Sequence, residues 1–170
     1  HATGKTKRKC FTVETKGGLV SIDLQVDRHG DAAAATVEMG IATFKPDALP
    51  CSLNVPELIQ QPIEAGGRSL IFTGVSVGNP HCVVFKPTGE SWSRDELLAL
   101  GPALEHHKLF PKRTNVQLVV PTGRNAVFIL IWERGAGETQ ASGSSSCAAA
   151  SAAVRLGLVK SPVTVKMPGG

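Results

Sequence analysis

One stretch near the C-terminus constrains the fold more than any other. An apolar run, residues 127–132, leads into a turn of glycine and hydroxyl side chains that ends near residue 145. An alanine-rich run follows, and it carries no charge before Arg155. This run predicts a helix over residues 146–156, and a helix that is apolar on nearly every side is typical of a buried position. We therefore expect a strand, a tight turn and a central buried helix.

The remainder of the chain reads mainly as short strands. Eighteen glycines and eleven prolines predict many turns, which favours a strand-rich fold over a helix bundle. Ser93 and Glu96 form a capping box that predicts a second, amphipathic helix, interrupted near Pro102. The expected strands cover residues 10–15, 19–26, 34–39, 69–77, 82–85, 114–120, 126–132 and 163–167. The fold class that follows is α+β, with a mixed, mostly antiparallel sheet curled around the central buried helix.

The positive charge of the chain lies almost entirely at its N-terminus. The formal net charge is +4, and four cations, Lys5, Lys7, Arg8 and Lys9, lie in the first nine residues without an acidic neighbour. Residues 1–9 are expected to be a disordered tail or a cloning remnant, and residues 10–170 a single domain. Since that domain is neutral and has few aromatic residues, it is not expected to bind nucleic acid. No apolar run is long enough to predict a membrane span.

The cysteines do not form a recognisable framework. Four of them are spread widely, with no Cys-x-x-Cys pair: Cys10, Cys51, Cys82 and Cys147. This pattern favours reduced thiols in a cytoplasmic protein over a disulfide scaffold. No Cys and His spacing typical of a structural zinc site occurs, so we expect no metal.

The start of the buried helix could hold an anion, because the first backbone N–H groups of a helix are unpaired and carry partial positive charge. Arg134 could hold the anion further, and Glu133 could bind an ammonium group. An amino acid is the simplest ligand with both charges. The alternative is structural: Glu133 and Arg134 pair with each other, and the serines only cap the helix.

Three motifs resemble those of the diaminopimelate epimerase family. They are Gly78-Asn79-Pro80-His81-Cys82, Arg113-Thr114-Asn115 and Glu133-Arg134-Gly135-Ala136-Gly137-Glu138-Thr139, and they occur in the family's order. The resemblance implies epimerisation of one α-carbon without a cofactor, most simply of LL- to meso-diaminopimelate in lysine and cell-wall biosynthesis. It also implies two similar domains, or lobes, with the site between them and one cysteine from each. Residues 10–170 resemble the second lobe only, so the first lobe is an expected partner.

The resemblance assigns substrate-binding roles to Glu133 and to five further residues. Asn79 and Asn115 would bind the distal end of the substrate. Arg134 would bind polar substrate groups together with Glu133. The backbone of Gly143 and Ser144 would donate to the α-carboxylate.

The resemblance also assigns the acid–base chemistry, and here the sequence departs from the family. Ser142 occupies the position of the second catalytic cysteine. Glu133 and His81 would tune the acid–base pair. Cys147, five residues further on, aligns with a cysteine that takes no part in catalysis and is expected to be a small core residue. Because a hydroxyl is a much weaker acid than a thiol and a poor base, we expect little or no two-base epimerisation from the chain as it stands.

Three functions remain open from the sequence. The first is the epimerase lobe described above. The second is a related cofactor-free racemase or isomerase of another small acid that uses Ser142. The third is a non-catalytic domain that binds a ligand or a partner, which could be a second copy of this chain.

Overall fold

The computed structural model describes residues 8–15 and 18–170. Most of the expected N-terminal tail, residues 1–7, lies outside this part of the chain, as do residues 16 and 17. The chain divides into two compact units, His1–Gly40 and Ile41–Gly170. No described helix is long and apolar enough to cross a membrane.

The first unit is a three-stranded antiparallel sheet in the order β1-β2-β3. Its strands are β1 (Cys10–Thr15), β2 (Gly18–Val26) and β3 (Ala32–Val37). The alternating residues that predicted a hairpin here pair as expected, with Phe11 opposite Ile22 and Val13 opposite Val20. The third strand begins two residues earlier than its apolar pattern suggested, at Ala32.

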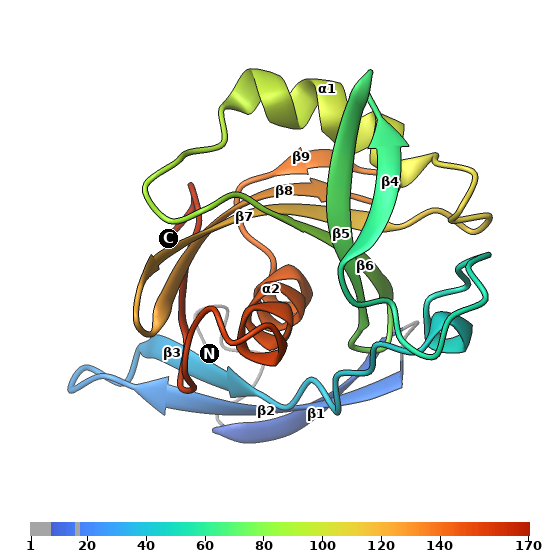
Figure 1. Ribbon diagram of the computed structural model, residues 1–170. Coiled ribbons are helices and arrows are strands. Elements are labelled where there is room, and N and C mark those ends of the chain that lie inside the picture. The colour runs from blue at the N-terminus through green and yellow to red at the C-terminus, as the bar shows by residue number, and fades with distance from the viewer. Residues whose placement is uncertain (1–7, 16–17) are drawn as a thin grey trace. The chain divides into compact units, whose positions relative to one another are not determined.

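The second unit contains a seven-stranded sheet in the order β10-β8-β7-β6-β5-β4, with β9 paired to β8 (Figure 1). Only the β6–β7 and β10–β8 pairs are parallel. The sheet is therefore mixed and mostly antiparallel, which confirms the expected fold class. The strands are β4 (Gln61–Ala65), β5 (Arg68–Ser76), β6 (Pro80–Phe85), β7 (Asn115–Gly123), β8 (Ala126–Glu133), β9 (Gly137–Thr139) and β10 (Thr164–Lys166), with a short 3-10 helix at Pro46–Ala48.

One face of this sheet packs on helix α2 (Gly143–Arg155), which lies on the concave side of the strands (Figure 1). Strand alternation sends Val127, Ile129 and Ile131 of β8 to this face, where they join the buried alanines of the helix. Alanine has a small side chain, so the helix axis can approach the sheet closely. The helix begins at Gly143, three residues before the expected start, and its last two residues, Val154 and Arg155, are exposed rather than buried.

The opposite face packs on helix α1 (Arg94–Glu105) (Figure 1). Its capping box is formed as predicted, since Ser93 Oγ accepts from Glu96 N and Ser93 N donates to the Glu96 carboxylate. The expected interruption at Pro102 is wrong, because the helix continues through it to Glu105. The carbonyl that loses its partner to a proline belongs to the residue four positions earlier, here Leu98, which is 40% exposed.

Candidate active site

Three of the expected site residues form a row across neighbouring strand ends. His81 near the start of β6 pairs with Asn115 at the start of β7. Val116 pairs with Trp132, so the next position outward places Asn115 opposite Glu133 at the end of β8. By strand alternation all three belong to the face that packs on α2, because they are in phase with Val83 and Ile131. Residues that are 52 positions apart in sequence therefore share one edge of one face.

Asn115 fixes the backbone around this row. Its side-chain nitrogen donates to the carbonyl of Pro80 at 2.8 Å, and its side-chain oxygen accepts from the backbone N–H of Arg134 at 3.0 Å. The side chain is buried, so these bonds are shielded from water. An asparagine amide has two donors and two lone pairs, so one of each remains for a ligand.

His81 is fully buried and lies beside this junction. Burial lowers its pKa to about 4, and the nearby positive charge of Arg134 acts in the same direction. Its Nε2 lies 2.9 Å from the side-chain oxygen of Asn79 in the β5–β6 loop. The imidazole is therefore neutral at physiological pH and donates through Nε2 to Asn79.

Glu133 and Arg134 do not pair with each other. Within the described residues the Glu133 carboxylate has no hydrogen bond or ion pair, while Arg134 Nη1 donates to the carbonyl of Lys112 at 3.2 Å. The structural alternative, a strand-end ion pair, is therefore wrong. Glu133 is half-buried and lies unpaired at the end of the row among the described residues.

The start of α2 lies on the same face of the sheet. Ser142 is the N-cap residue with extended backbone, but its side chain makes no capping hydrogen bond; its Oγ lies 3.5 Å from Ser144 Oγ. The first helical amides, those of Gly143, Ser144 and Ser145, have no intrahelical acceptor. Gly143 is exposed, and a Cβ added there would meet nothing within 4 Å. A small anion can therefore approach these amides closely.

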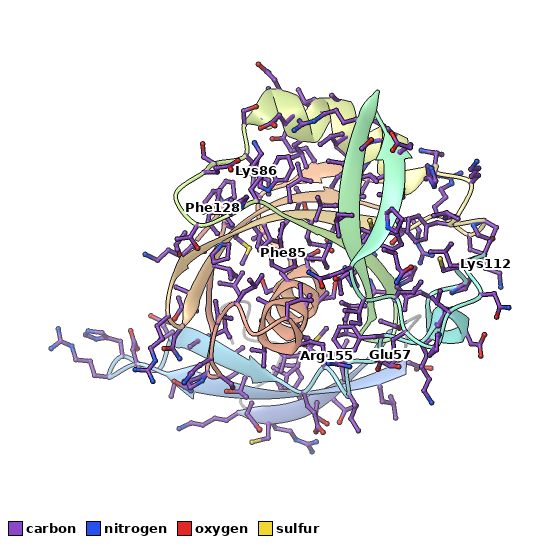
Figure 2. All side chains as sticks on the ribbon, viewed as in Figure 1. Glu57, Phe85, Lys86, Lys112, Phe128 and Arg155 are labelled. Carbon is purple, nitrogen blue, oxygen red and sulfur yellow. The ribbon has the colours of Figure 1, made fainter. Side chains whose placement is uncertain are left out.

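Two contacts attach this helix to the sheet and its loops. Near the start of α2, Gln117 Nε2 of β7 donates to Ser145 Oγ at 3.0 Å. At the other end, Arg155 donates to Glu57 at 2.6 Å, and Figure 2 labels this pair beside the helix. The helix start is thus held by a buried bond and the helix end by an exposed one.

Sequence reasoning missed Glu105, the last residue of α1. It is 3% exposed, and its carboxylate accepts from Trp132 Nε1 and from Gly135 N, both at 2.8 Å. Burial opposes its ionisation, but these two donors and the nearby His106 and Arg113 bring its pKa below the usual value. Glu105 therefore holds the turn that follows Glu133. An acidic residue at a helix C-terminus opposes the helix dipole, and that was the available signal.

None of the four cysteines lies in surroundings that favour its thiolate form. All four are free, and the pKa of each is raised. Burial is the cause at Cys147, which packs partly buried against the face that contacts α2. Cys82, next to His81, belongs instead to the core on the α1 side. The described residues also contain no group of three or more His, Cys, Asp or Glu that could hold a metal ion.

The expected site residues thus fall into two groups. The first is joined by direct bonds, Asn79 with His81 and Asn115 with Arg134, and has Glu133 beside it. The second is the helix start, Ser142 to Ser144. Among the described residues no hydrogen bond or ion pair joins Ser142 to His81 or Glu133.

A mixed sheet curved around a small-residue helix is the fold of known amino-acid epimerases and racemases. A hydroxyproline epimerase from Agrobacterium vitis superimposes with a TM-score of 0.64 at 15% identity, over 99% of this chain and 51% of that one. A probable proline racemase from Agrobacterium radiobacter K84 gives 0.61 at 12% identity, over 98% and 52%. These likenesses show the fold.

Sequence comparison gives the family. The family model described as diaminopimelate epimerase matches residues 73–170, more than half of the chain. The chain therefore belongs to the diaminopimelate epimerase family, which confirms the resemblance seen in its motifs. A diaminopimelate epimerase of Synechococcus sp. (strain JA-3-3Ab) is 44% identical over 79% of this chain and 48% of the relative. One of Methanothermobacter thermautotrophicus is 37% identical over 96% and 56%. The chain spans about half the length of these curated relatives.

Proposed function

We propose that this chain is one lobe of a cofactor-independent amino-acid epimerase that converts LL- to meso-diaminopimelate in the cytoplasm, for lysine and cell-wall synthesis. Family membership supports the reaction class. The observation that carries the proposal is the bond from Arg134 N to Asn115 Oδ1, because it holds the unpaired Glu133 carboxylate at the end of the polar row. The face that carries this row also packs on α2.

In this proposal the substrate spans both groups of residues. Its α-carboxylate accepts from the amides of Gly143 and Ser144, where the partial positive charge of the helix start stabilises an anion. An ammonium group binds Glu133. The distal end binds Asn79 and the donor and lone pair that Asn115 still has free, with Arg134 close to the polar groups.

The reaction removes the α-proton on one face and returns a proton on the other. The carbanion that forms between these steps is stabilised by fixed donors around the carboxylate. Neutral His81 and the Glu133 side chain set the electrostatic surroundings of the base. The base itself is best supplied by a thiolate, whose usual pKa of about 8.5 can be lowered by donors and helix starts. Ser142 supplies only a hydroxyl at this point, so the chain as it stands is proposed to be inactive.

The proposal requires a complementary first lobe that supplies the second base and closes the site. The test joins this chain to the first lobe of the Synechococcus relative, with Ser142 or with Ser142→Cys, and measures exchange of the α-proton of diaminopimelate in deuterium oxide. Exchange by the Ser142→Cys protein, reduced at least 100-fold with Ser142, is the expected result. Absence of exchange by the Ser142→Cys protein, with the joined protein shown to be folded, would contradict the proposal.

A second candidate follows from Ser142 itself. Its side chain makes no capping bond, and a hydroxyl that is not needed for the helix is available to a ligand. A related isomerase of another small acid could use this hydroxyl. A panel of amino and hydroxy acids, incubated with the same Ser142 protein, decides between the two: turnover of any of them supports this second function, and inertness supports the first.

A further inference from the structure

Two buried polar atoms beside the row of strand ends have no hydrogen-bond partner among the described residues. They are Nδ1 of His81 and Oε1 of Gln117. Both residues are 0% exposed, so bulk water does not reach either atom. An unpaired polar atom at such depth costs about 1–3 kcal/mol, and native structures avoid it. The two orphans therefore need one explanation.

The two residues belong to adjacent strands and face the same side. Val83, two positions after His81, pairs with Gln117, so the two side chains are neighbours on the α2 face. The Gln117 side chain lies close enough to His81 to influence its ionisation. Each residue also makes one further bond: His81 Nε2 to Asn79 Oδ1 at 2.9 Å, and Gln117 Nε2 to Ser145 Oγ at 3.0 Å.

In this arrangement both unpaired atoms are acceptors. The Asn79 oxygen can only accept, so the ring proton of neutral His81 is on Nε2 and Nδ1 is left as an acceptor. Gln117 Oε1 is an acceptor as well. A half-turn of the Gln117 amide exchanges its nitrogen and oxygen without moving any other atom of the side chain. The nitrogen then donates to His81 Nδ1, and the oxygen accepts from the Ser145 hydroxyl, whose hydrogen rotates freely.

We propose that Gln117 is a positioning residue that, together with Asn79, holds His81 in its Nε2–H tautomer and links it to the start of α2. The links run in one direction: Ser145 Oγ–H donates to Gln117 Oε1, Gln117 Nε2–H donates to His81 Nδ1, and His81 Nε2–H donates to Asn79 Oδ1. Every polar atom of this buried chain of hydrogen bonds is satisfied, with no charge placed in the core.

The chain of hydrogen bonds connects the two groups of site residues that no direct bond joins. Ser145 lies in the first turn of α2, three residues after Ser142. Asn79 lies in the loop before β6. A shift of the helix start therefore moves the Ser145 hydroxyl that orients the Gln117 amide. The amide then reorients, and the ring of His81 follows the Gln117 Nε2–H group that donates to it. Its relevance to catalysis rests on the proposed function, whereas the hydrogen bonds themselves do not.

Nitrogen NMR tests the proposal on the 170-residue chain, because long-range proton–nitrogen spectra of the His81 ring distinguish the Nε2–H from the Nδ1–H tautomer. The wild-type chain is expected to show the Nε2–H form alone at neutral pH. Gln117→Met keeps the length of the side chain but removes its donor, so the Nδ1 signal is expected to shift toward that of a nitrogen without a hydrogen bond, while the proton stays on Nε2. Gln61→Met, on edge strand β4, is the matched control and should leave the His81 signals unchanged.

A second variant covers the case in which Gln117→Met does not fold. Ser145→Ala removes the hydroxyl that orients the amide and is expected to shift both His81 ring nitrogens, whereas Ser151→Ala on the same helix should not. The Nδ1–H tautomer in the wild-type chain would overturn the proposal, as would unchanged His81 signals in Ser145→Ala and in a folded Gln117→Met. No substrate is involved, so failure here is distinct from failure of α-proton exchange.

Discussion

The carboxylate of Glu105 accepts a hydrogen bond of 2.8 Å from the backbone N–H of Gly135, thirty positions further along the chain. The same carboxylate accepts from Trp132 on the other side of the turn. A buried anion at the end of α1 thus fixes the geometry of the turn that follows Glu133. This turn is therefore held by a helix on the opposite face of the sheet.

Replacing Glu105 with glutamine should destabilise the chain. One of its two accepting oxygens becomes an amide donor that faces another N–H, leaving a buried donor unpaired at a cost of about 1–3 kcal/mol. Urea unfolding measures the change. Glu138→Gln is the control, because Glu138 pairs with Arg94, whose side chain is 68% exposed. That variant should lose no more than about 1 kcal/mol, and equal losses in the two variants would contradict this view of Glu105.

Replacing Gly101 with alanine should also destabilise the chain, although alanine favours helices. A Cβ at this position would lie 2.6 Å from two ring atoms of Trp132. Relieving this clash should cost about 1–3 kcal/mol, more than the gain in helix propensity of about 1 kcal/mol. Gly123→Ala is the control, since its Cβ would meet only Ala126 at 4.0 Å. A thermal melt of Gly101→Ala at or above the wild-type midpoint would show that α1 does not pack as described.

His81 should make stability depend on pH in a defined window. Burial lowers its pKa from 6.5 to about 4 in the folded chain, so the unfolded chain takes up a proton first as pH falls. The free energy of unfolding is therefore full above about pH 6.5 and decreases toward pH 4, by about 2 kcal/mol between about pH 7 and pH 5. His81→Gln should remove most of this dependence.

A second histidine needs a control in the same experiment. The pKa of His107 is also lowered, by partial burial and by the nearby charge of Lys108. His107→Gln should remove only the smaller part of the slope. If the slope in this window instead persists in His81→Gln and disappears in His107→Gln, the assignment to His81 is wrong.

The sequence predicted the elements whose signal is local. The alanine-rich run specified α2, and the Ser93–Glu96 spacing specified the start of α1. Strand β4 was missed because Pro62 lies inside it, yet a proline is tolerated on an edge strand, which is where β4 lies. The effect of Pro102 on the continuity of α1 was overestimated. Leu100 and Leu104 are buried on either side of it, and their packing holds the helix together.

Only those site residues that lie within a recognisable sequence motif were predicted. Asn79, His81 and Asn115 stand in recognisable motifs, and the structure brings them to one edge. Glu105, Gln117 and Ser145 carry no such mark, because their roles depend on partners 27 to 30 positions away. The bond from Arg134 N to Asn115 Oδ1 is equally invisible in sequence.

The proposed function depends on binding of an α-carboxylate at the start of α2. The most direct measurement is an NMR titration with diaminopimelate of the protein in which this chain is joined to a first lobe. The backbone amide signals of Gly143, Ser144 and Ser145 are followed. These three signals are expected to shift together and saturate, whereas 1,5-diaminopentane, which lacks the carboxylates, should leave them in place. Binding of diaminopimelate that leaves these three amides unchanged, or equal shifts with the diamine, would rule out carboxylate binding at the helix start.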